Sequence, residues 1–221
     1  MFSRCSPGRD AGAERMIADF VAHLFPRMVR DKDLRLRHTF CLGGLAFTAF
    51  LVLGLSGGLL LFFYLPSPGK AFESILLLES GVPGGRYLRS LHRVASHLFL
   101  AAIFLHSLRV LVTGAYRKPR ELNWIIGFSL LVLAVFDAYT GYLLPMDQMA
   151  LWATQTGMHL LKTVPFGEPV FRFLVPDGVG QTVSLHRFYA IHVALAPLLI
   201  LTLSLLHFYR VRKDKRGLPN L

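Results

Sequence analysis

Four histidines in two apolar segments have a spacing that suits paired metal ligands. His92 and His106 are 14 residues apart, and His192 and His207 are 15 apart. An α-helix turns about 100° and rises about 1.5 Å per residue, so the members of each pair lie near one helix face, about 21 to 22 Å apart. Two such helices facing each other form two bis-histidine sites at different depths. Imidazole is an axial ligand of haem iron, so the pattern indicates two candidate haem sites.

Four glycines repeat this spacing in two other apolar segments. Gly43 and Gly57 are 14 residues apart, and so are Gly127 and Gly141. Small residues also serve ordinary helix packing in membranes. Because glycine lets the backbone approach a flat macrocycle closely, we expect these two segments to form the walls of the sites and the histidine segments to supply the ligands.

The histidines also have a simpler interpretation. A single histidine in a membrane helix can merely hydrogen-bond a neighbour, but two pairs at matched depth are hard to explain in that way. His97 is about 140° round the helix from His92, and we expect it in packing or in a subunit contact. Pro197 lies between His192 and His207, and a kink there would adjust the helical phase.

The segments that carry these residues are long enough to cross a membrane. About 30 Å of hydrocarbon requires about 20 apolar residues in a helix, and four stretches qualify, at about 39–64, 88–112, 124–144 and 188–209. Of the 221 residues, 53% are hydrophobic and only 17% are charged, which is unlike a soluble domain. We predict an all-α, transmembrane four-helix haem-binding bundle.

We divide the chain into three parts. Residues 39–213 form the membrane domain and residues 214–221 a basic tail. In residues 1–38, apolar side chains recur at helical spacing, which predicts an amphipathic helix on the cytoplasmic-side membrane surface. A helix docked on a partner protein would have the same pattern. Residues 147–161 and 167–175 have the pattern of short amphipathic helices on the outer surface.

Basic residues are distributed unequally between the connections. Of 24 Lys and Arg residues, 17 fall on the N-terminal segment, the connection between the second and third spans and the C-terminal end. Cytoplasmic segments carry the surplus of Lys and Arg in membrane proteins, so we place both termini in the cytoplasm. The net charge of +11 is explained by this topology and does not indicate a nucleic-acid partner.

Five segments together resemble a known family. They are "FCLGG", "RSLHR", "KPRELNW", "TGYLLPMDQ" and "HRFYAIHVALAPLL". They are similar to cytochrome b6 and to the N-terminal half of cytochrome b, the haem-bearing subunits of quinol:cytochrome c and quinol:plastocyanin oxidoreductases. The resemblance covers about residues 39–213. The 15-residue spacing in the fourth span and the short chain favour the b6 branch, in which a separate subunit carries the remaining helices.

The resemblance implies how the histidines pair. His92 with His192 would hold an outer haem b of lower potential, and His106 with His207 an inner haem b of higher potential. The iron of each haem would then have two axial imidazole ligands, one from the second span and one from the fourth.

Four further residues match family positions around the haems. Arg89 and Arg109 match positions near haem propionates, where a cation is needed beside lipid, although snorkelling to the interface is the alternative for each. Cys41 in "TFCLGG" matches the position that attaches a third, c-type haem through one thioether bond near the inner quinone site. On composition alone, without a CxxCH motif, Cys41 is a small apolar residue at a helix end. Arg212 matches a basic position near that third haem.

The chain also departs from the family pattern. Met146 stands where the family usually has a Trp, and His186 stands where the family has no histidine. Asp137 lies where the family is apolar. Because Asp137 is four residues before Gly141, it faces the bundle, and an ionisable group inside a membrane is a functional candidate. We hypothesise that Asp137 affects proton release near quinol oxidation. The family signature Pro-Glu-Trp-Tyr is absent and is expected on a partner subunit.

The resemblance implies a subunit of an oxidoreductase that is not active alone. Quinol is oxidised near the outer surface, one electron leaves through a Rieske-type iron–sulfur protein, and the other crosses through two b haems to reduce quinone near the inner side. The expected partners are a subunit-IV-like membrane subunit, the Rieske protein, a c-type cytochrome or similar acceptor, and quinone. We expect a dimeric complex in the bacterial cytoplasmic membrane.

Two rival functions fit part of the pattern. A dihaem cytochrome b anchor of a periplasmic dehydrogenase or hydrogenase, which passes electrons to or from quinone, also uses imidazole ligands but requires neither Cys41 nor the paired glycines. A membrane scaffold or transporter without cofactors would be colourless when purified.

Overall fold

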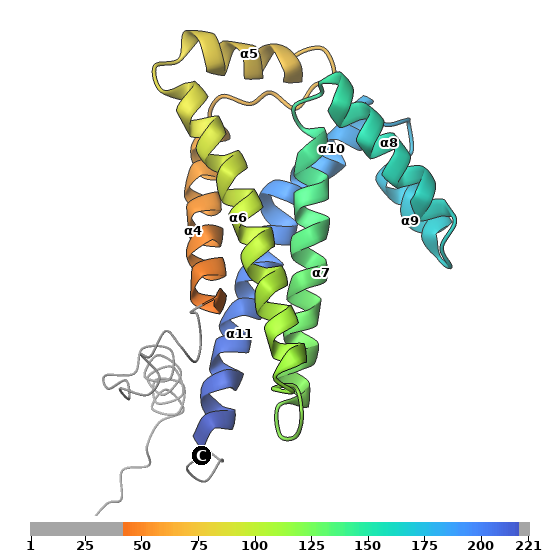
Figure 1. Cartoon of the computed structure of the whole chain (residues 1–221). Helices are drawn as coiled ribbons and strands as arrows, with labels where there is room; N and C mark the ends of the chain where they lie inside the picture. The colour runs from red at the N-terminus through yellow and green to blue at the C-terminus, as the bar shows by residue number, and fades with distance from the viewer. Residues whose placement is uncertain (1–41, 217–221) are drawn as a thin grey trace, which may run out of the picture.

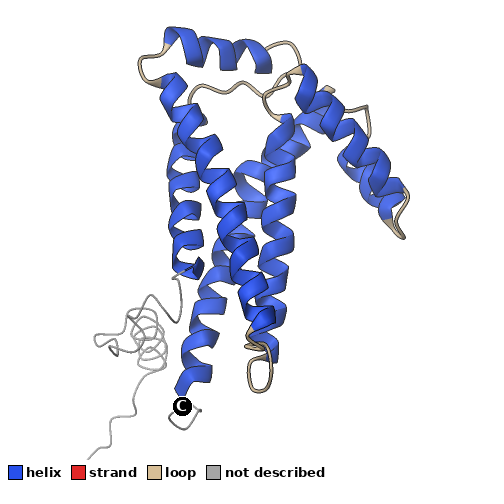
Figure 2. Cartoon of the chain, viewed as in Figure 1, coloured by secondary structure: helices blue, strands red, loops and turns tan. Residues whose placement is uncertain are grey.

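The computed structural model describes residues 42–216, with side chains described to residue 213, and the regular secondary structure of this part of the chain is all helical, joined by loops and turns (Figures 1 and 2). The predicted all-α class is therefore confirmed. The predicted amphipathic helix in residues 1–38, the residue Cys41 and the end of the basic tail lie outside the described residues. In order, the elements are α4 (Leu42–Leu60), α5 (Ala71–Gly81), α6 (Gly85–Val112), α7 (Glu121–Leu143), α8 (Gln148–Lys162), α9 (Gly167–Leu174), α10 (Thr182–Ala190), the π-helical turn η1 (Ile191–Leu195) and α11 (Ala196–Arg216).

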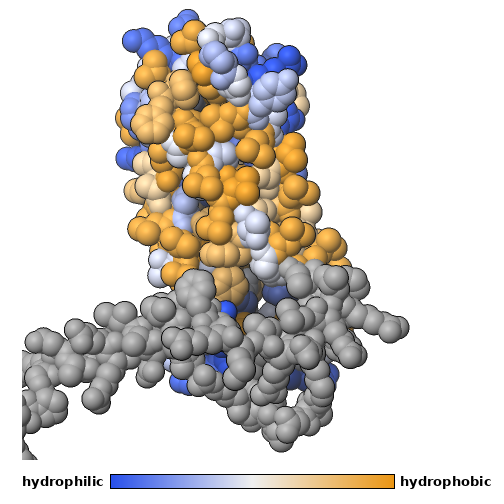
Figure 3. All heavy atoms as spheres, turned by 90° about the vertical axis from the view of Figure 1, so that its left-hand side faces the viewer, coloured by the Kyte–Doolittle hydropathy of each residue, from blue (hydrophilic) through white to orange (hydrophobic). Residues whose placement is uncertain are grey.

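Within residues 42–216, four helical stretches are long and apolar enough to cross a membrane. They are α4, α6, α7 and the continuous run Thr182–Lys213 formed by α10, η1 and α11. The four predicted spans are thus present, with different ends. Large apolar side chains point outward along them, among them Leu55 at 74% and Val112 at 79% exposure. They form the apolar band visible in Figure 3, which suits a lipid surrounding.

The fourth span begins at Thr182, earlier than the predicted 188, because Asp177 caps it. The carboxylate of Asp177 accepts hydrogen bonds from the backbone N–H of Val183 at 2.7 Å, from the N–H of Ser184 at 3.0 Å and from the Ser184 hydroxyl. These are donors of the first turn that have no partner within the helix. The capped turn extends the helix beyond the apolar segment.

The helices of the bundle pack on one another through small side chains. Ala46 and Ala49 of α4, Ala102 of α6 and Ala134 of α7 are buried in one cluster with Phe99. Small residues allow close approach of helix backbones inside a membrane, where packing contributes to helix association. In Figure 1, α4 runs beside α6 while α7 runs beside α11, so the bundle contains two helix pairs.

A second cluster lies at the end of the bundle that carries α8 and α9. It is built around Leu143, Leu185 and Phe188, each of which is fully buried. The hydroxyl of Tyr64 donates to the carbonyl of Leu144 at 2.7 Å, which ties the segment after α4 to the end of α7. Burial raises the pKa of Tyr64, so this hydroxyl remains a hydrogen-bond donor.

Three surface helices cover this end of the bundle. The segments predicted at 147–161 and 167–175 are α8 and α9, with Asp147 capping α8 by accepting from the N–H of Ala150 at 2.8 Å. Our sequence analysis missed α5. Its buried residues Ala71, Ser74 and Leu78 have helical spacing, which is the signal that could have revealed it.

The π-helical turn η1 explains the unequal histidine spacings. It contains His192 and ends just before Pro197, which has no backbone N–H to donate. A π-turn of this kind adds one residue to an α-helix. The 15 residues from His192 to His207 therefore cover the same rotation as the 14 from His92 to His106, which is the phase adjustment that the sequence left to Pro197.

Candidate haem sites between the paired histidines

The structure brings the four histidines together in two pairs. The ring centres of His92 and His192 are 6.2 Å apart with an interplanar angle of 84°. The ring centres of His106 and His207 are 6.5 Å apart at 85°. In each pair, one imidazole comes from α6 and the other from η1 or α11, so each site bridges the two helix pairs of the bundle.

These distances fit one iron ion between each two rings. A metal lies about 2 Å from an imidazole nitrogen, and that nitrogen is about 1.1 Å from the ring centre, so two coaxial ligands separate the ring centres by about 6 Å. In the described part of the chain, no group of three or more His, Cys, Asp and Glu side chains could hold a bare metal ion. A site with two protein ligands suits haem, whose porphyrin occupies the other positions around iron.

Each of the four glycines contacts one imidazole. A Cβ atom added to Gly43 would lie 3.3 Å from Cε1 of His106, and one at Gly127 would lie 3.2 Å from Cε1 of His207. At Gly57, the same atom would be 3.1 Å from Cε1 of His92. The glycines therefore leave room for the imidazoles themselves, a closer role than the walls we expected.

Gly141 is the tightest of these positions. A Cβ atom there would lie 2.8 Å from both Nδ1 and Nε2 of His192. Real Cβ atoms essentially never approach so closely, so only glycine at this position leaves the ring where it is. This contact joins α7 to η1, just as Gly57 joins α4 to α6 at the same end.

The pair formed by His92 and His192 is oriented by hydrogen bonds to Nδ1. Nδ1 of His92 lies 2.9 Å from the hydroxyl oxygen of Ser56, and Nδ1 of His192 lies 3.0 Å from the carbonyl oxygen of Asp137. With Nδ1 engaged on both rings, Nε2 is left for iron. Such partners fix the orientation of a metal-binding imidazole and increase its basicity. Ser56 was not singled out from the sequence, although its place next to Gly57 could have suggested it.

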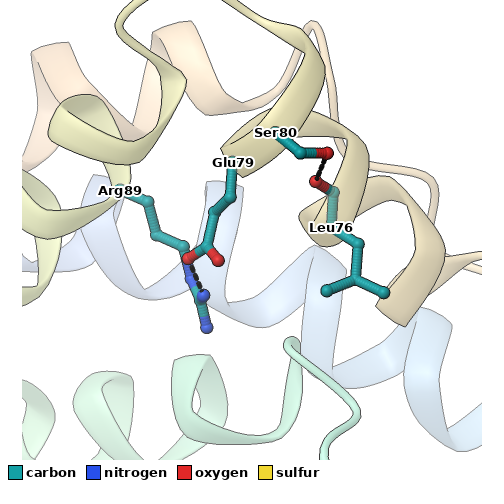
Figure 4. Close-up of polar contacts among 4 residues, drawn as sticks. All are labelled: Leu76, Glu79, Ser80 and Arg89. Carbon is teal, nitrogen blue, oxygen red and sulfur yellow. Dashed lines mark hydrogen bonds and ion pairs between the residues drawn. The ribbon is translucent and has the colours of Figure 1, made fainter.

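Arg89 contacts a carboxylate in the structure. The guanidinium of Arg89, at the start of α6, forms an ion pair with Glu79 of α5, as Figure 4 shows. The pair ties the surface helix α5 to the bundle. Arg109 lies in the last turn of α6 and Arg212 lies in α11. Their placement near haem propionates or a third haem stays a prediction.

The remaining candidate residues lie apart from the pairs. His97 is exposed on α6, and His186 is exposed near the start of α10 with Nδ1 at 2.7 Å from the carbonyl oxygen of Thr182. Met146 has a positive φ of 53°. Its side chain lies close to Gly180, where an added Cβ atom would be 3.1 Å from its terminal methyl carbon. None of these contacts brings the three residues to the histidine pairs.

A four-helix membrane bundle that holds two bis-histidine sites at different depths is the architecture of a membrane-bound b-type cytochrome. The family model described as "Cytochrome b(N-terminal)/b6/petB" matches residues 97–220. The chain belongs to this family, which confirms the resemblance found in the sequence.

Individual relatives agree with the family assignment. Cytochrome b6 of Heliobacterium modesticaldum is 37% identical over 205 residues, which cover 92% of this chain and 93% of that protein. The menaquinol:cytochrome c reductase cytochrome b subunit of Bacillus subtilis is 38% identical over 202 residues, with 90% of each chain covered.

A solved structure described as "Hyperthermophilic respiratory Complex III" has a TM-score of 0.74 and 28% identity to this chain. The match covers 96% of this chain but only 54% of that one, so the chain spans about half the length of that solved structure.

Proposed function

We propose that this chain is the haem-bearing subunit of a quinol:cytochrome c, or similar acceptor, oxidoreductase that carries electrons across a membrane. The observation that carries the proposal is the geometry of the two histidine pairs, 6.2 and 6.5 Å between ring centres, in a chain of the cytochrome b family. The relatives include cytochrome b6 and menaquinol:cytochrome c reductase subunits. The chain is therefore part of an oxidoreductase and binds haem b.

The four histidines are the proposed axial ligands of two separate haem sites. His92 and His192 are the proposed ligands at the outer site, and His106 and His207 are the proposed ligands at the inner site. Iron bound between two imidazoles can exchange single electrons between its ferric and ferrous states. The chain holds the two rings of each pair at a fixed separation, through the glycine contacts at both sites and the Nδ1 hydrogen bonds at the outer one.

The positions of the pairs suit transfer across the membrane. His92 and His106 are about four helical turns apart on α6, which is about 21 Å. One site therefore lies towards each end of the bundle. We propose that the outer site faces quinol oxidation and the inner site faces quinone reduction. Separation of charge across the low-dielectric layer then stores energy.

The finer parts of the proposal concern cofactors and partners. They are a c-type haem bound through Cys41, a quinone at each side, a Rieske-type iron–sulfur protein, a subunit-IV-like membrane subunit, a c-type cytochrome or similar acceptor, and a dimeric assembly in the bacterial cytoplasmic membrane with both termini in the cytoplasm. The motif "TFCLGG" supports the c-type haem, and the distribution of Lys and Arg residues supports the cytoplasmic termini. The resemblance to the family supports the quinone and the partners. The role of Asp137 in proton release stays a prediction.

The proposal is tested by the haem content of the purified complex. Extraction with acidified acetone should release two haems per chain and leave one on the protein. The Cys41→Ser variant should lose the retained haem and keep b-type absorbance. A folded preparation without b-type absorbance would contradict the proposal and favour a scaffold or transporter.

Release of every haem from the wild-type chain would remove the c-type haem from the proposal and leave the two b haems. The dihaem anchor of a periplasmic dehydrogenase or hydrogenase predicts this result as well. Copurification of an iron–sulfur protein would distinguish the two functions. The family assignment favours the quinol:cytochrome c oxidoreductase.

A further inference from the structure

The carboxyl group of Asp137 lies against the proposed outer-site ligand His192. Nδ1 of His192 is 3.1 Å from Oδ1 of Asp137, in addition to its 3.0 Å contact with the carbonyl oxygen of the same residue. The side chain of His192 is only 20% exposed and that of Asp137 only 16%. Oδ1 of Asp137 is buried and has no hydrogen-bond partner, so its 3.1 Å approach to Nδ1 is a close contact of the carboxyl group beside the hydrogen bond to the carbonyl oxygen. One N–H therefore faces two oxygen atoms of a single residue.

The inner site has an amide at the equivalent position of α7. Asn123 is four residues before Gly127, just as Asp137 is four residues before Gly141. Oδ1 of Asn123 is buried without a hydrogen-bond partner, and so is Nδ1 of the neighbouring ligand candidate His207. The 14-residue repeat of α7 thus places a carboxyl group at the outer site and a neutral amide at the inner site.

The other outer-site ligand has a neutral partner. Nδ1 of His92 faces the hydroxyl of Ser56 at 2.9 Å, and a hydroxyl brings no net charge. A negative charge beside an N–H interacts with it more strongly than a neutral group does, especially in a low dielectric. Asp137 therefore distinguishes the two sites more than Ser56 does.

We propose that Asp137 is a positioning residue for His192 that lowers the midpoint potential of the outer haem relative to the inner one. The inference rests on the proposed function, because it requires that His192 binds haem iron. The Nδ1–H of His192 donates to the carbonyl oxygen of Asp137, and the carboxylate 3.1 Å from Nδ1 places negative charge beside the same N–H. This charge makes the imidazole a stronger electron donor, since partners of metal-bound histidine raise ligand basicity. A stronger donor stabilises ferric over ferrous iron, so the outer haem becomes harder to reduce than the inner haem.

The effect of the Asp137 carboxylate on the potential can be tested without changing the orientation of the His192 ring. The carbonyl oxygen of Asp137 holds Nδ1 of His192 whatever side chain the residue carries. Replacement of the side chain therefore leaves one acceptor in place and removes only the carboxylate. Loss of a hydrogen-bonding partner of a metal ligand typically costs about 10- to 100-fold in metal affinity or activity. We expect a change of about tenfold in the reduction equilibrium, which is about 59 mV for one electron.

The experiment is a redox titration of the b haems in membranes that contain the assembled complex. Asp137→Asn and Asp137→Leu should each raise the midpoint potential of the outer haem, with the larger rise in Asp137→Leu because an amide oxygen still carries a partial negative charge near Nδ1 of His192. The low-spin EPR signal of the outer ferric haem should shift in the same variants. The inner haem should be unchanged.

A reciprocal variant and a control complete the test. Asn123→Asp should lower the potential of the inner haem, since it gives His207 the same partner that His192 has. Asp147→Asn removes a carboxylate from the outer surface while an Asn cap retains α8, and it should leave both potentials unchanged.

The results separate this inference from the proposed function. Two bound haems with an unchanged outer potential in both Asp137 variants would overturn the inference and leave the proposed function intact. An equal rise in Asp147→Asn would also overturn it, because the effect would then be general surface charge. Absence of b haem from the wild-type complex would instead refute the proposed function.

Discussion

At the scale of single residues, glycine decides whether each imidazole can occupy its place. Gly57 and Gly141 lie against the outer pair, and Gly43 and Gly127 lie against the inner pair. Neighbouring glycines differ, since an added Cβ atom at Gly58 would meet nothing within 4 Å. The chain therefore contains matched glycines with and without a ring beside them.

Gly57→Val and Gly141→Ala should lower the content of the outer haem, because the added carbon atoms displace His92 or His192. Gly58→Val, on the same helix as Gly57, should retain both haems, since open space surrounds that position. Reduced-minus-oxidised spectra of each variant, resolved into the two b haems, measure the effect. Equal haem content in Gly57→Val and Gly58→Val would show that the contact with His92 is unimportant.

At the scale of the elements, the π-turn η1 keeps the histidines of the fourth span in register with those of α6. The turn is located at His192, where a π-turn often marks a functional site. It provides one residue more than a continuous α-helix would need. The register of the two sites thus depends on the local geometry of a single turn.

Deletion of Ala194 from η1 should allow the turn to become α-helical and leave His192 and His207 in register, so both b haems should be retained. Deletion of the exposed residue Leu98 from α6, which has no π-turn, should rotate His92 by about 100° relative to His106 and remove one haem. The ratio of haem to protein measures both outcomes. Equal haem loss in the two deletions would contradict the role of the π-turn.

The stability of the first turn of α10 should depend on pH, because the carboxylate of Asp177 caps that turn. The hydrogen bond from the Ser184 hydroxyl is the main cause that lowers the pKa of Asp177 from its ordinary value of 3.8. A lowered pKa in the folded state means that the ionised carboxylate stabilises the cap. This contribution is present at neutral pH and is lost as the pH falls below about 4 through the lowered pKa.

Amide hydrogen exchange measures this dependence. Protection of the Val183 and Ser184 amides, corrected for intrinsic exchange rates, should fall between pH 6 and pH 3 in the wild-type protein. It should change much less in Asp177→Asn, whose side chain does not titrate. A wild-type protein with the same protection at both pH values would contradict the assigned cap.

At the scale of the whole molecule, the bundle has two distinct ends. The end of α11 and the connection between α6 and α7 lie at the bottom of Figure 1, and α4 begins on the same, lower side of the bundle. Helix α5 lies across the top, and α8 and α9 lie at the upper right. The bottom connection carries Arg117, Lys118 and Arg120. Basic connections favour the cytoplasmic side, which supports the proposed topology.

Single cysteines should report this orientation in whole cells. An impermeant maleimide should label Lys70→Cys, in the exposed connection between α4 and α5, without permeabilisation. Lys118→Cys, exposed at the other end, should be labelled only after the membrane is opened. The wild-type chain provides the background from Cys5 and Cys41. The opposite labelling pattern would invert the proposed topology.

The sequence alone predicted the all-α class, the four spans, the family and the histidine candidates. These features depend on local properties. The hydropathy, the length and the 3.6-residue period of a helix can each be read from one segment without knowledge of its neighbours. The amphipathic pattern also predicted α8 and α9. The helix α5 was not predicted, although its buried residues Ala71, Ser74 and Leu78 have helical spacing.

The tertiary structure alone decided which side chains meet. Ser56 reaches His92 across 36 residues of sequence, and Asp137 reaches His192 across 55. The carboxylate of Glu79 forms an ion pair with Arg89, although the resemblance implied a haem propionate as the partner of Arg89. Such contacts follow from how separate helices pack, and the period of one helix does not specify its rotation against another. The sequence therefore determined which residues could bind haem, and the packing of the helices determined their partners.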